Sequence, residues 1–184
     1  VSAAGGSAYG LAAINGATLS GDAKSAIGNI TVTANAEYRD AYGVYAEKGG
    51  KVSAGLGDVT VRSQQYRAFG IAAVNGGSVD AAMNGGALSV SGRSYSFGID
   101  AAGSSVTFTG ARSVAVSSDA GDAYGVTAAN GTVSGDLGGM SVYGAAGEFI
   151  DGVRAYSSDV KLAMDGSLNV SGGGIGMDGI EAGN

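Results

Sequence analysis

Two aspartates near the C-terminus have the residue type and the spacing for acid–base chemistry. Asp151 and Asp178 are 27 residues apart, and each is followed by glycine and an aliphatic residue. If they occupy one position in successive turns of a stacked fold, their carboxylates lie roughly 5 Å apart, the separation that a retaining glycosidase uses for its acid and its nucleophile. The pair is therefore a candidate for polysaccharide cleavage. Equal residues also line up in any repeat, so a structural role stays open.

Composition limits other kinds of chemistry. The chain contains no histidine and no cysteine, which excludes nucleophilic catalysis by a Ser-His or Cys-His pair and leaves no thiolate metal site. Its net charge is −6, and its ten Lys and Arg residues are scattered. Nucleic acid is therefore a poor partner, because phosphate binding needs clustered cations. No stretch approaches the roughly 18 apolar residues of a transmembrane helix, so we expect this segment to make no membrane contact.

One sequence motif indicates a metal. Residues 173–181 read Gly-Gly-Ile-Gly-Met-Asp-Gly-Ile-Glu, which fits the nonapeptide pattern of calcium-binding β-rolls with Asp178 as the carboxylate ligand. The motif occurs once, whereas a β-roll needs copies on adjacent turns, and Leu168 with Asn169 breaks the pattern upstream. We therefore expect no cofactor and keep calcium near Asp178 as the alternative.

The two aspartates belong to a four-residue motif that recurs along the chain. Its copies begin at Ala8, Ala41, Ala68, Ser96, Ala123, Ile150 and Met177, and most read Ala, an aromatic residue, Gly and an aliphatic residue. Successive copies are separated by 33, 27, 28, 27, 27 and 27 residues. Self-similarity at a nearly constant period marks a solenoid, in which each unit buries its apolar face against its neighbours.

Each repeat unit also contains three short apolar stretches with the alternation of half-buried strands. The first carries the motif itself. The second and third supply aliphatic columns, namely Leu19, Val52, Val79, Val106, Val133 and Val160, and then Ile30, Val59, Leu88, Val114, Met140 and Leu168. The 36 glycines supply tight turns, and the absence of proline suits strands that have neighbours on both sides.

These patterns predict an all-β fold. We expect residues 1–184 to form a single parallel β-helix, with three short strands in each rung of about 27 residues and six to seven rungs. A right-handed coil is expected, because parallel crossovers are almost always right-handed. Neither end carries an obvious polar cap, so we expect an internal fragment of a longer repeat protein.

Aromatic residues in the repeat are the first candidates for binding. One repeat position is occupied by Tyr9, Tyr42, Phe69, Phe97 and Tyr124, and then by Asp151 and Asp178. A ladder of rings can bind sugar faces or anchor a protein, and it can equally stack on itself. Counting by twos places Tyr42 on the same face as Val44 and Ala46. Since a dry interior would penalise the two aspartates, we expect this column to lie at a corner.

The repeat style resembles that of a known family. Residues 41–52 read Ala-Tyr-Gly-Val-x-Ala-x-x-Gly-Gly-x-Val, and a Val-x-Val strand follows at Val59. This pattern, which covers nearly the whole chain, is similar to the passenger β-helices of bacterial autotransporters, the surface adhesins of Gram-negative cells. The resemblance implies export to the bacterial cell surface, an extracellular location and a role in adhesion, aggregation or biofilm. It contains no catalytic signature.

Three functional classes follow from the sequence. The first is a non-catalytic structural and adhesive stalk segment, which contacts a host or cell-surface protein, a glycan or another copy of itself. The second is an extracellular filament subunit that joins end to end through open rungs. The third is a polysaccharide-processing enzyme centred on Asp151 and Asp178, and the lack of other catalytic groups makes us expect no enzyme activity.

Overall fold

The computed structural model describes residues 1–21, 27–147 and 149–184, and it places twenty β-strands in three parallel sheets. Sheet A contains β1 (Ser2–Ala3), β4 (Ile30–Ala34), β7 (Val59–Ser63), β10 (Ala87–Gly92), β13 (Ser113–Ser118), β16 (Met140–Gly144) and β19 (Leu168–Gly172). Sheet B contains β2 (Ala8–Ile14), β5 (Ala41–Glu47), β8 (Arg67–Val74), β11 (Tyr95–Ala102), β14 (Ala123–Ala129), β17 (Phe149–Tyr156) and β20 (Gly176–Gly183). Sheet C contains β3 (Thr18–Ser20), β6 (Lys51–Gly55), β9 (Ser78–Ala82), β12 (Ser105–Ala111), β15 (Thr132–Leu137) and β18 (Asp159–Met164).

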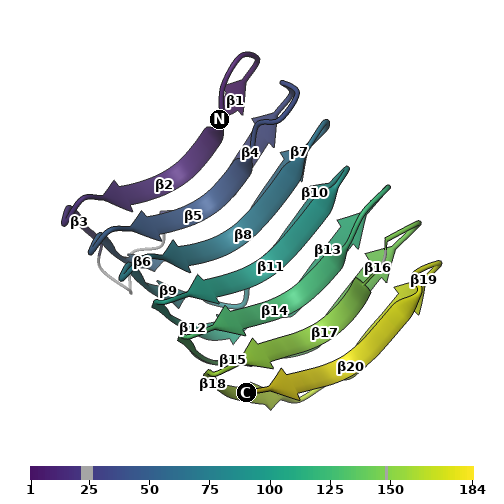
Figure 1. Ribbon diagram of the computed structural model, residues 1–184. Coiled ribbons are helices and arrows are strands. Elements are labelled where there is room, and N and C mark those ends of the chain that lie inside the picture. Colours follow the sequence, from purple (N-terminus) through teal and green to yellow (C-terminus); the bar gives the residue numbers. More distant parts are fainter. Residues whose placement is uncertain (22–26, 148) are drawn as a thin grey trace.

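The chain winds through sheets B, C and A in turn, so that one strand of each makes one rung of a β-solenoid (Figure 1). Each strand pairs in parallel with the equivalent strand of the next rung, as where Tyr124 lies opposite Asp151. The predicted parallel β-helix with a repeat of 27 residues is therefore confirmed. The described part of the chain has no helix that is long and apolar enough to span a membrane.

The predicted aliphatic columns pair in register. Val79 lies between Val52 and Val106 in sheet C. In sheet A, Leu88 lies between Val59 and Val114. Alternation at a period of two directs these side chains to one face of each sheet, and closing the three sheets around one axis turns that face inward.

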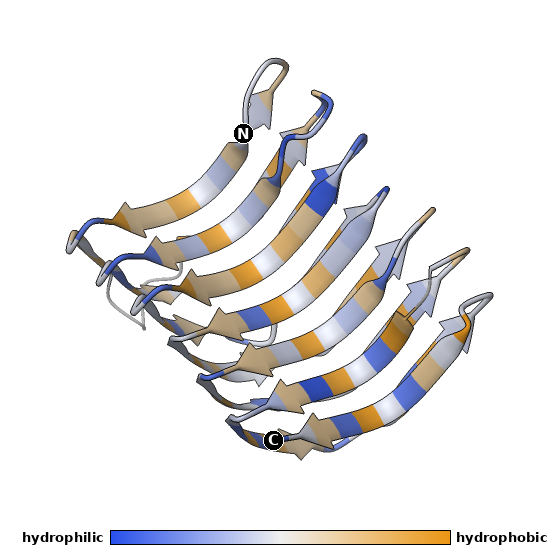
Figure 2. Ribbon diagram, viewed as in Figure 1, coloured by the Kyte–Doolittle hydropathy of each residue, from blue (hydrophilic) through white to orange (hydrophobic). Residues whose placement is uncertain are grey.

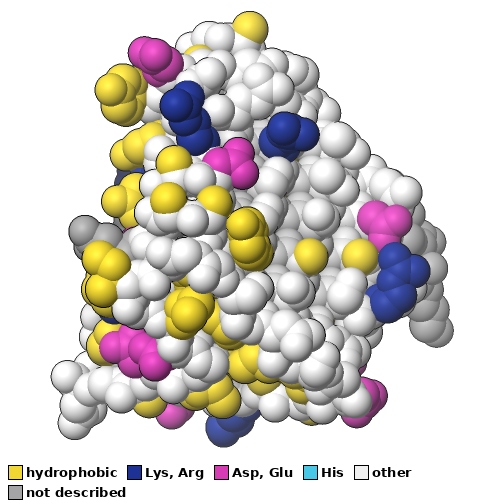
Figure 3. All heavy atoms as spheres, turned by 90° about the vertical axis from the view of Figure 1, so that its right-hand side faces the viewer, with side chains coloured by type: hydrophobic (Ala, Val, Ile, Leu, Met, Phe, Trp, Pro, Cys, Tyr) yellow, Lys and Arg dark blue, Asp and Glu magenta, His cyan; other side chains and the backbone are white. Residues whose placement is uncertain are grey.

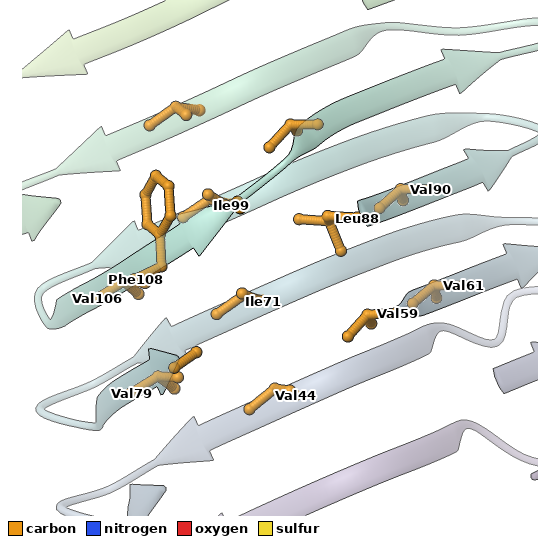
Figure 4. Packing of buried hydrophobic residues seen from close by; sticks show 14 of the residues in the cluster. Val44, Val59, Val61, Ile71, Val79, Leu88, Val90, Ile99, Val106 and Phe108 are labelled. Carbon is orange, nitrogen blue, oxygen red and sulfur yellow. The ribbon is translucent and has the colours of Figure 1, made fainter. Parts of the chain in front are cut away.

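The inward side chains form a single apolar core along the axis of the coil. Figure 4 shows Val44, Ile71 and Ile99 of sheet B meeting Val59, Val61, Leu88 and Val90 of sheet A and Val79, Val106 and Phe108 of sheet C. All of these side chains are buried. Hydrophobic bands consequently align from strand to strand across sheet B (Figure 2).

The motif glycine breaks the alternation in sheet B. A Cβ atom at Gly43 would lie 2.8 Å from Val59 and 2.9 Å from Val61, so this position faces the core. Val44, the next residue, also belongs to the core, whereas Tyr42 packs against a separate outer cluster. The prediction that Tyr42 shares a face with Val44 was therefore wrong, because the strand bends at Gly43 and turns two consecutive residues inward.

From Gly10 to Gly152 the glycine column leaves no room for a side chain. A Cβ atom at Gly98 would lie 2.5 Å from the carbonyl oxygen of Gly125 and 2.9 Å from Val116. Backbone cannot move aside as a flexible side chain can, so we expect Gly98→Ala to lower the free energy of unfolding by about 1–3 kcal/mol in urea denaturation. Gly5→Ala is the control, since nothing lies within 4 Å of a Cβ atom there. Equal stabilities of the two variants would contradict this packing.

Candidate functional site

The motif aromatic residues form a ladder on the outer face of sheet B. Consecutive rings of Tyr9, Tyr42, Phe69, Phe97 and Tyr124 stack with centroids 4.7–5.1 Å apart and interplanar angles of 4–19°. The column lies inside the sheet, since Tyr42 is the second residue of β5 and Asp151 is the third residue of β17. The expectation that it lies at a corner was wrong, because the bend at the motif glycine sends these side chains outward without a corner.

Stacking occupies the faces of the ladder rings. Phe97 lies between Phe69 and Tyr124, so each face of its ring is covered by a neighbour. Tyr45 adds a second layer, with its centroid 4.5 Å from that of Tyr42. Because a sugar binds an aromatic residue through the ring face, the inner rungs offer a partner only ring edges. The main role of the ladder is therefore to stabilise the stacking of the rungs, and its contact with a ligand is limited to ring edges.

Polar side chains hold the ladder along one edge. The Tyr42 hydroxyl donates to Asp40 Oδ2 at 3.0 Å, and Arg67 donates to both Asp40 oxygens at 2.9 and 2.8 Å. The Tyr124 hydroxyl donates to Asp122 in the same way. Burial, followed by the nearby Asp40 charge, raises the pKa of Tyr42 well above its ordinary value and keeps the phenol neutral.

These polar partners were missed by the sequence reasoning. Asp40, Arg67 and Asp122 come directly before the motif, one residue ahead of its first position in their rungs. A column of these preceding residues would have revealed acids and a base beside the rings. The sequence analysis compared the apolar columns, the aromatic column and the Asp151–Asp178 pair, and it did not align the position before the motif from rung to rung.

A second outer column, which runs parallel to the ladder, carries the polar groups of a groove. Its residues follow the motif aliphatic and pair from rung to rung, in the order Tyr45, Ala72, Asp100, Thr127, Arg154 and Glu181. Two hollows of about 420 and 280 Å³ lie over this column, and both are lined by Phe97 and Asp100. Arg67 lines the first and Arg154 the second. We call the two hollows together the sheet B groove.

Asp100, the acid that lines both hollows of the groove, is hydrogen-bonded to a neighbouring side chain. The Asp100 carboxylate accepts a short hydrogen bond from the Thr127 hydroxyl. Burial raises the pKa of Asp100, and the hydrogen bond from Thr127 opposes this rise. On the face shown in Figure 3, charged side chains of both signs are scattered, and they form no stripe of one sign. In the groove itself, on the face of sheet B, Asp100, Arg67 and Arg154 supply single charges of both signs beside the aromatic edges.

The ladder ends where Asp151 replaces a ring. The Arg154 guanidinium lies over the last ring, with Cζ 5.4 Å from the Tyr124 centroid. Its Nε atom is 3.6 Å from Asp151 Oδ2 and 3.0 Å from Glu181 Oε2. Figure 2 shows hydrophilic bands in β17 and β20, the strands that carry Asp151, Arg154, Asp178 and Glu181. An apolar column thus becomes a charged one within a single rung.

Asp151 and Asp178 are neighbours in register, and Glu181 joins them. One carboxylate oxygen of each lies within 4.8 Å of those of the other two. Asp151 has no exposed surface, however. A glycosidase needs both its acid and its nucleophile in contact with the sugar, so the pair as arranged gives a substrate access to Asp178 alone. Glu181 was not singled out from the sequence, although it lies three residues after Asp178, as Arg154 lies three after Asp151.

Ring stacking predicts unequal effects of one substitution at two aromatic positions. Phe97→Leu removes two stacked pairs, so we expect it to lower the free energy of unfolding by about 1–3 kcal/mol. Phe149→Leu is the matched control. Phe149 lies on the same sheet and is 40% exposed, and within the described residues its ring stacks on no other ring and contacts the Arg154 guanidinium. Its expected loss is about 0.5–1 kcal/mol. Urea denaturation measures both, and equal losses would show that stacking contributes nothing.

The burial of Asp151 predicts that the free energy of unfolding depends on pH. Burial raises its pKa to about 6; Arg154 opposes the rise, and Glu181 and Asp178 add to it. The folded chain therefore holds a proton that the unfolded chain releases between about pH 4 and about pH 6. We expect the contribution of Asp151 to the free energy of unfolding to be highest below about pH 4, to fall between about pH 4 and about pH 6, and then to level off.

Asp151→Asn should remove this slope and raise stability at pH 7 by roughly 2–3 kcal/mol. Urea denaturation across the pH range, in EDTA, measures the free energy of unfolding of both chains. Asp80→Asn, at an exposed position in β9, is the control that should keep the slope. A slope that persists in Asp151→Asn would assign the pH dependence to another group.

Comparisons of the chain with protein-family models, with curated proteins and with solved structures found no match. The assignment of a β-solenoid therefore rests on the strand register and the core described above.

Proposed function

We propose that this chain is a non-catalytic stalk segment of a bacterial surface protein, exported to the cell exterior, with an adhesive outer face. The observation that carries the proposal is the sheet B groove, in which aromatic edges and charged groups lie together on one side of the solenoid. The repeat style of autotransporter passengers supports the location and the adhesive role.

The architecture suits a stalk. Backbone pairing joins every strand of an inner rung to the rungs on both sides, and each rung adds roughly 4.8 Å of length. Pairing of all strands with no open lateral edge makes such a rod resistant to bending and to aggregation from the side. Length then depends on the number of rungs alone, so an adhesive face can be held away from the cell by adding repeats.

The groove favours a protein partner. Ring faces in the ladder are covered by neighbouring rings, so a glycan has few faces on which to stack. Ring edges and the half-exposed Tyr95, with Arg67 and Arg154 beside them, match the residue types that contribute most to protein interfaces. A host or cell-surface protein is the favoured partner, and a glycan partner gives a different outcome in the same assay.

Binding of the labelled 184-residue chain to host cells tests the proposal. Tyr95→Ser should reduce binding about fivefold, because truncating an interface tyrosine typically costs more than 1 kcal/mol. The control is Tyr143→Ser, because Tyr143 is 49% exposed against 39% for Tyr95 and lies in β16 of sheet A. Protease treatment of the cells should abolish binding, whereas loss after glycosidase treatment alone would identify a glycan partner. Equal binding of the two variants, or no binding by the unmodified chain, would contradict the proposal.

The polysaccharide-processing enzyme and the end-to-end filament stay predictions. A polysaccharide-processing enzyme would need Asp151 to become accessible, since it has no exposed surface. A filament would need rungs of two copies to pair end to end, as successive rungs of one copy do.

A further inference from the structure

Three carboxylates gather on the outer face of sheet B beside the end of the ladder. Asp151 lies in β17, and Asp178 and Glu181 lie in the adjacent strand β20. One carboxylate oxygen from each residue lies within 4.8 Å of those of the other two. Negative charges at this distance repel one another strongly outside bulk water, so the cluster is stable only with a positive partner or with bound protons.

A second observation is independent of this clustering. The Asp151 side chain has no exposed surface, and no donor among the described residues lies in hydrogen-bond geometry with either of its carboxylate oxygens. The backbone of Asp178 comes near them, and its effect on the pKa of Asp151 is the smallest of those that neighbouring groups exert. Buried carboxylates are costly unless they are hydrogen-bonded, paired with a charge or bound to a metal. Asp151 therefore lacks the ligand that would offset its burial, and it is directed toward the other two acids.

Arg154 does not donate the hydrogen bond that the Asp151 carboxylate lacks. Its Nε atom lies 3.6 Å from Asp151 Oδ2, which is longer than the roughly 2.7–2.9 Å of a charge-assisted hydrogen bond. The guanidinium instead lies 3.0 Å from Glu181 Oε2 and donates to the hydroxyls of Tyr156 and Tyr124. Three carboxylates and one guanidinium also leave two negative charges in the cluster, the complement of one divalent cation.

We propose that Asp151, Asp178 and Glu181 bind one divalent cation, and that Ca²⁺ suits the site best. All three ligands are hard oxygen atoms, which Ca²⁺ binds at about 2.3–2.6 Å. Two oxygens on one Ca²⁺ ion can therefore lie up to about 5 Å apart, and the spacing of 4.8 Å or less in the cluster agrees with this limit. Mg²⁺, with bonds of about 2.0–2.1 Å and a stricter octahedral geometry, suits such spacing less well.

The proposed site differs from the β-roll motif in the sequence. Asp178 belongs to both, but the other ligands come from Glu181 on the same strand and from Asp151 one rung earlier. The bound ion would join β17 to β20 through side chains as well as backbone. Its effect is therefore to stabilise the pairing of these two rungs, and it depends on neither adhesion nor enzyme activity.

Calorimetric titration of Ca²⁺ into the EDTA-treated and dialysed 184-residue chain tests the site. We expect one ion per chain, a dissociation constant of about 10⁻⁴–10⁻³ M and a rise in melting temperature with added Ca²⁺. Asp178→Asn and Glu181→Gln should each weaken binding at least tenfold. Asp178 is exposed, so Asp178→Asn should fold normally, and Asp80→Asn is the matched exposed control that should bind as the unmodified chain does.

Terbium luminescence provides a second measurement of binding at this site. Tb³⁺ replaces Ca²⁺ at oxygen sites and emits when a nearby tyrosine is excited. The Tyr156 hydroxyl lies 2.6 Å from Glu181 Oε1, so we expect sensitised emission that excess Ca²⁺ removes and that Tyr156→Phe reduces. Absence of Ca²⁺ binding at about 10 mM, or unchanged affinity in both Asp178→Asn and Glu181→Gln, would overturn the proposal.

Discussion

In-register stacking of the rungs controls which residue types each position of the repeat accepts. Each strand pairs with its equivalent in the next rung, so a paired position of the repeat meets the same position in the adjacent rungs, as Tyr124 meets Asp151. An aliphatic residue then forms a continuous dry column, whereas a charged residue meets another charge roughly 5 Å away. Inward positions consequently accept Val, Ile, Leu and Ala, and charges lie outside.

The motif glycine gives sheet B two useful faces. Its missing side chain lets the strand bend beside the carbonyl of the next rung, and the residues before and after it then point in opposite directions. One short motif thus supplies an aliphatic column for the core and an aromatic column for the outer surface. Rings tolerate in-register stacking as well as aliphatic side chains do, because offset aromatic pairs attract.

The change from rings to acids at Asp151 reverses this balance. Phe97 and Tyr124 gain from their neighbours, whereas Asp151 and Asp178 repel each other in the same column. Arg154 offsets part of that repulsion while covering the last ring of the ladder. The sheet B groove and the carboxylate cluster therefore lie side by side on one sheet and share Arg154, although they suit different partners.

The period, the three strands per rung and the aliphatic columns at Val79 and Leu88 could be predicted from the sequence. These follow from local alternation and from self-similarity, which need no knowledge of neighbours in space. The sequence also placed Asp151 beside Asp178, since equal repeat positions stack. The direction of the Tyr42 side chain could not be predicted, because the bend at Gly43 changes the alternation of the strand and is visible only in the folded chain. The burial of Asp151 and the contacts of Arg154 with Tyr124 and Glu181 likewise depend on side chains from several rungs packing around one point, and no spacing along the chain encodes that packing.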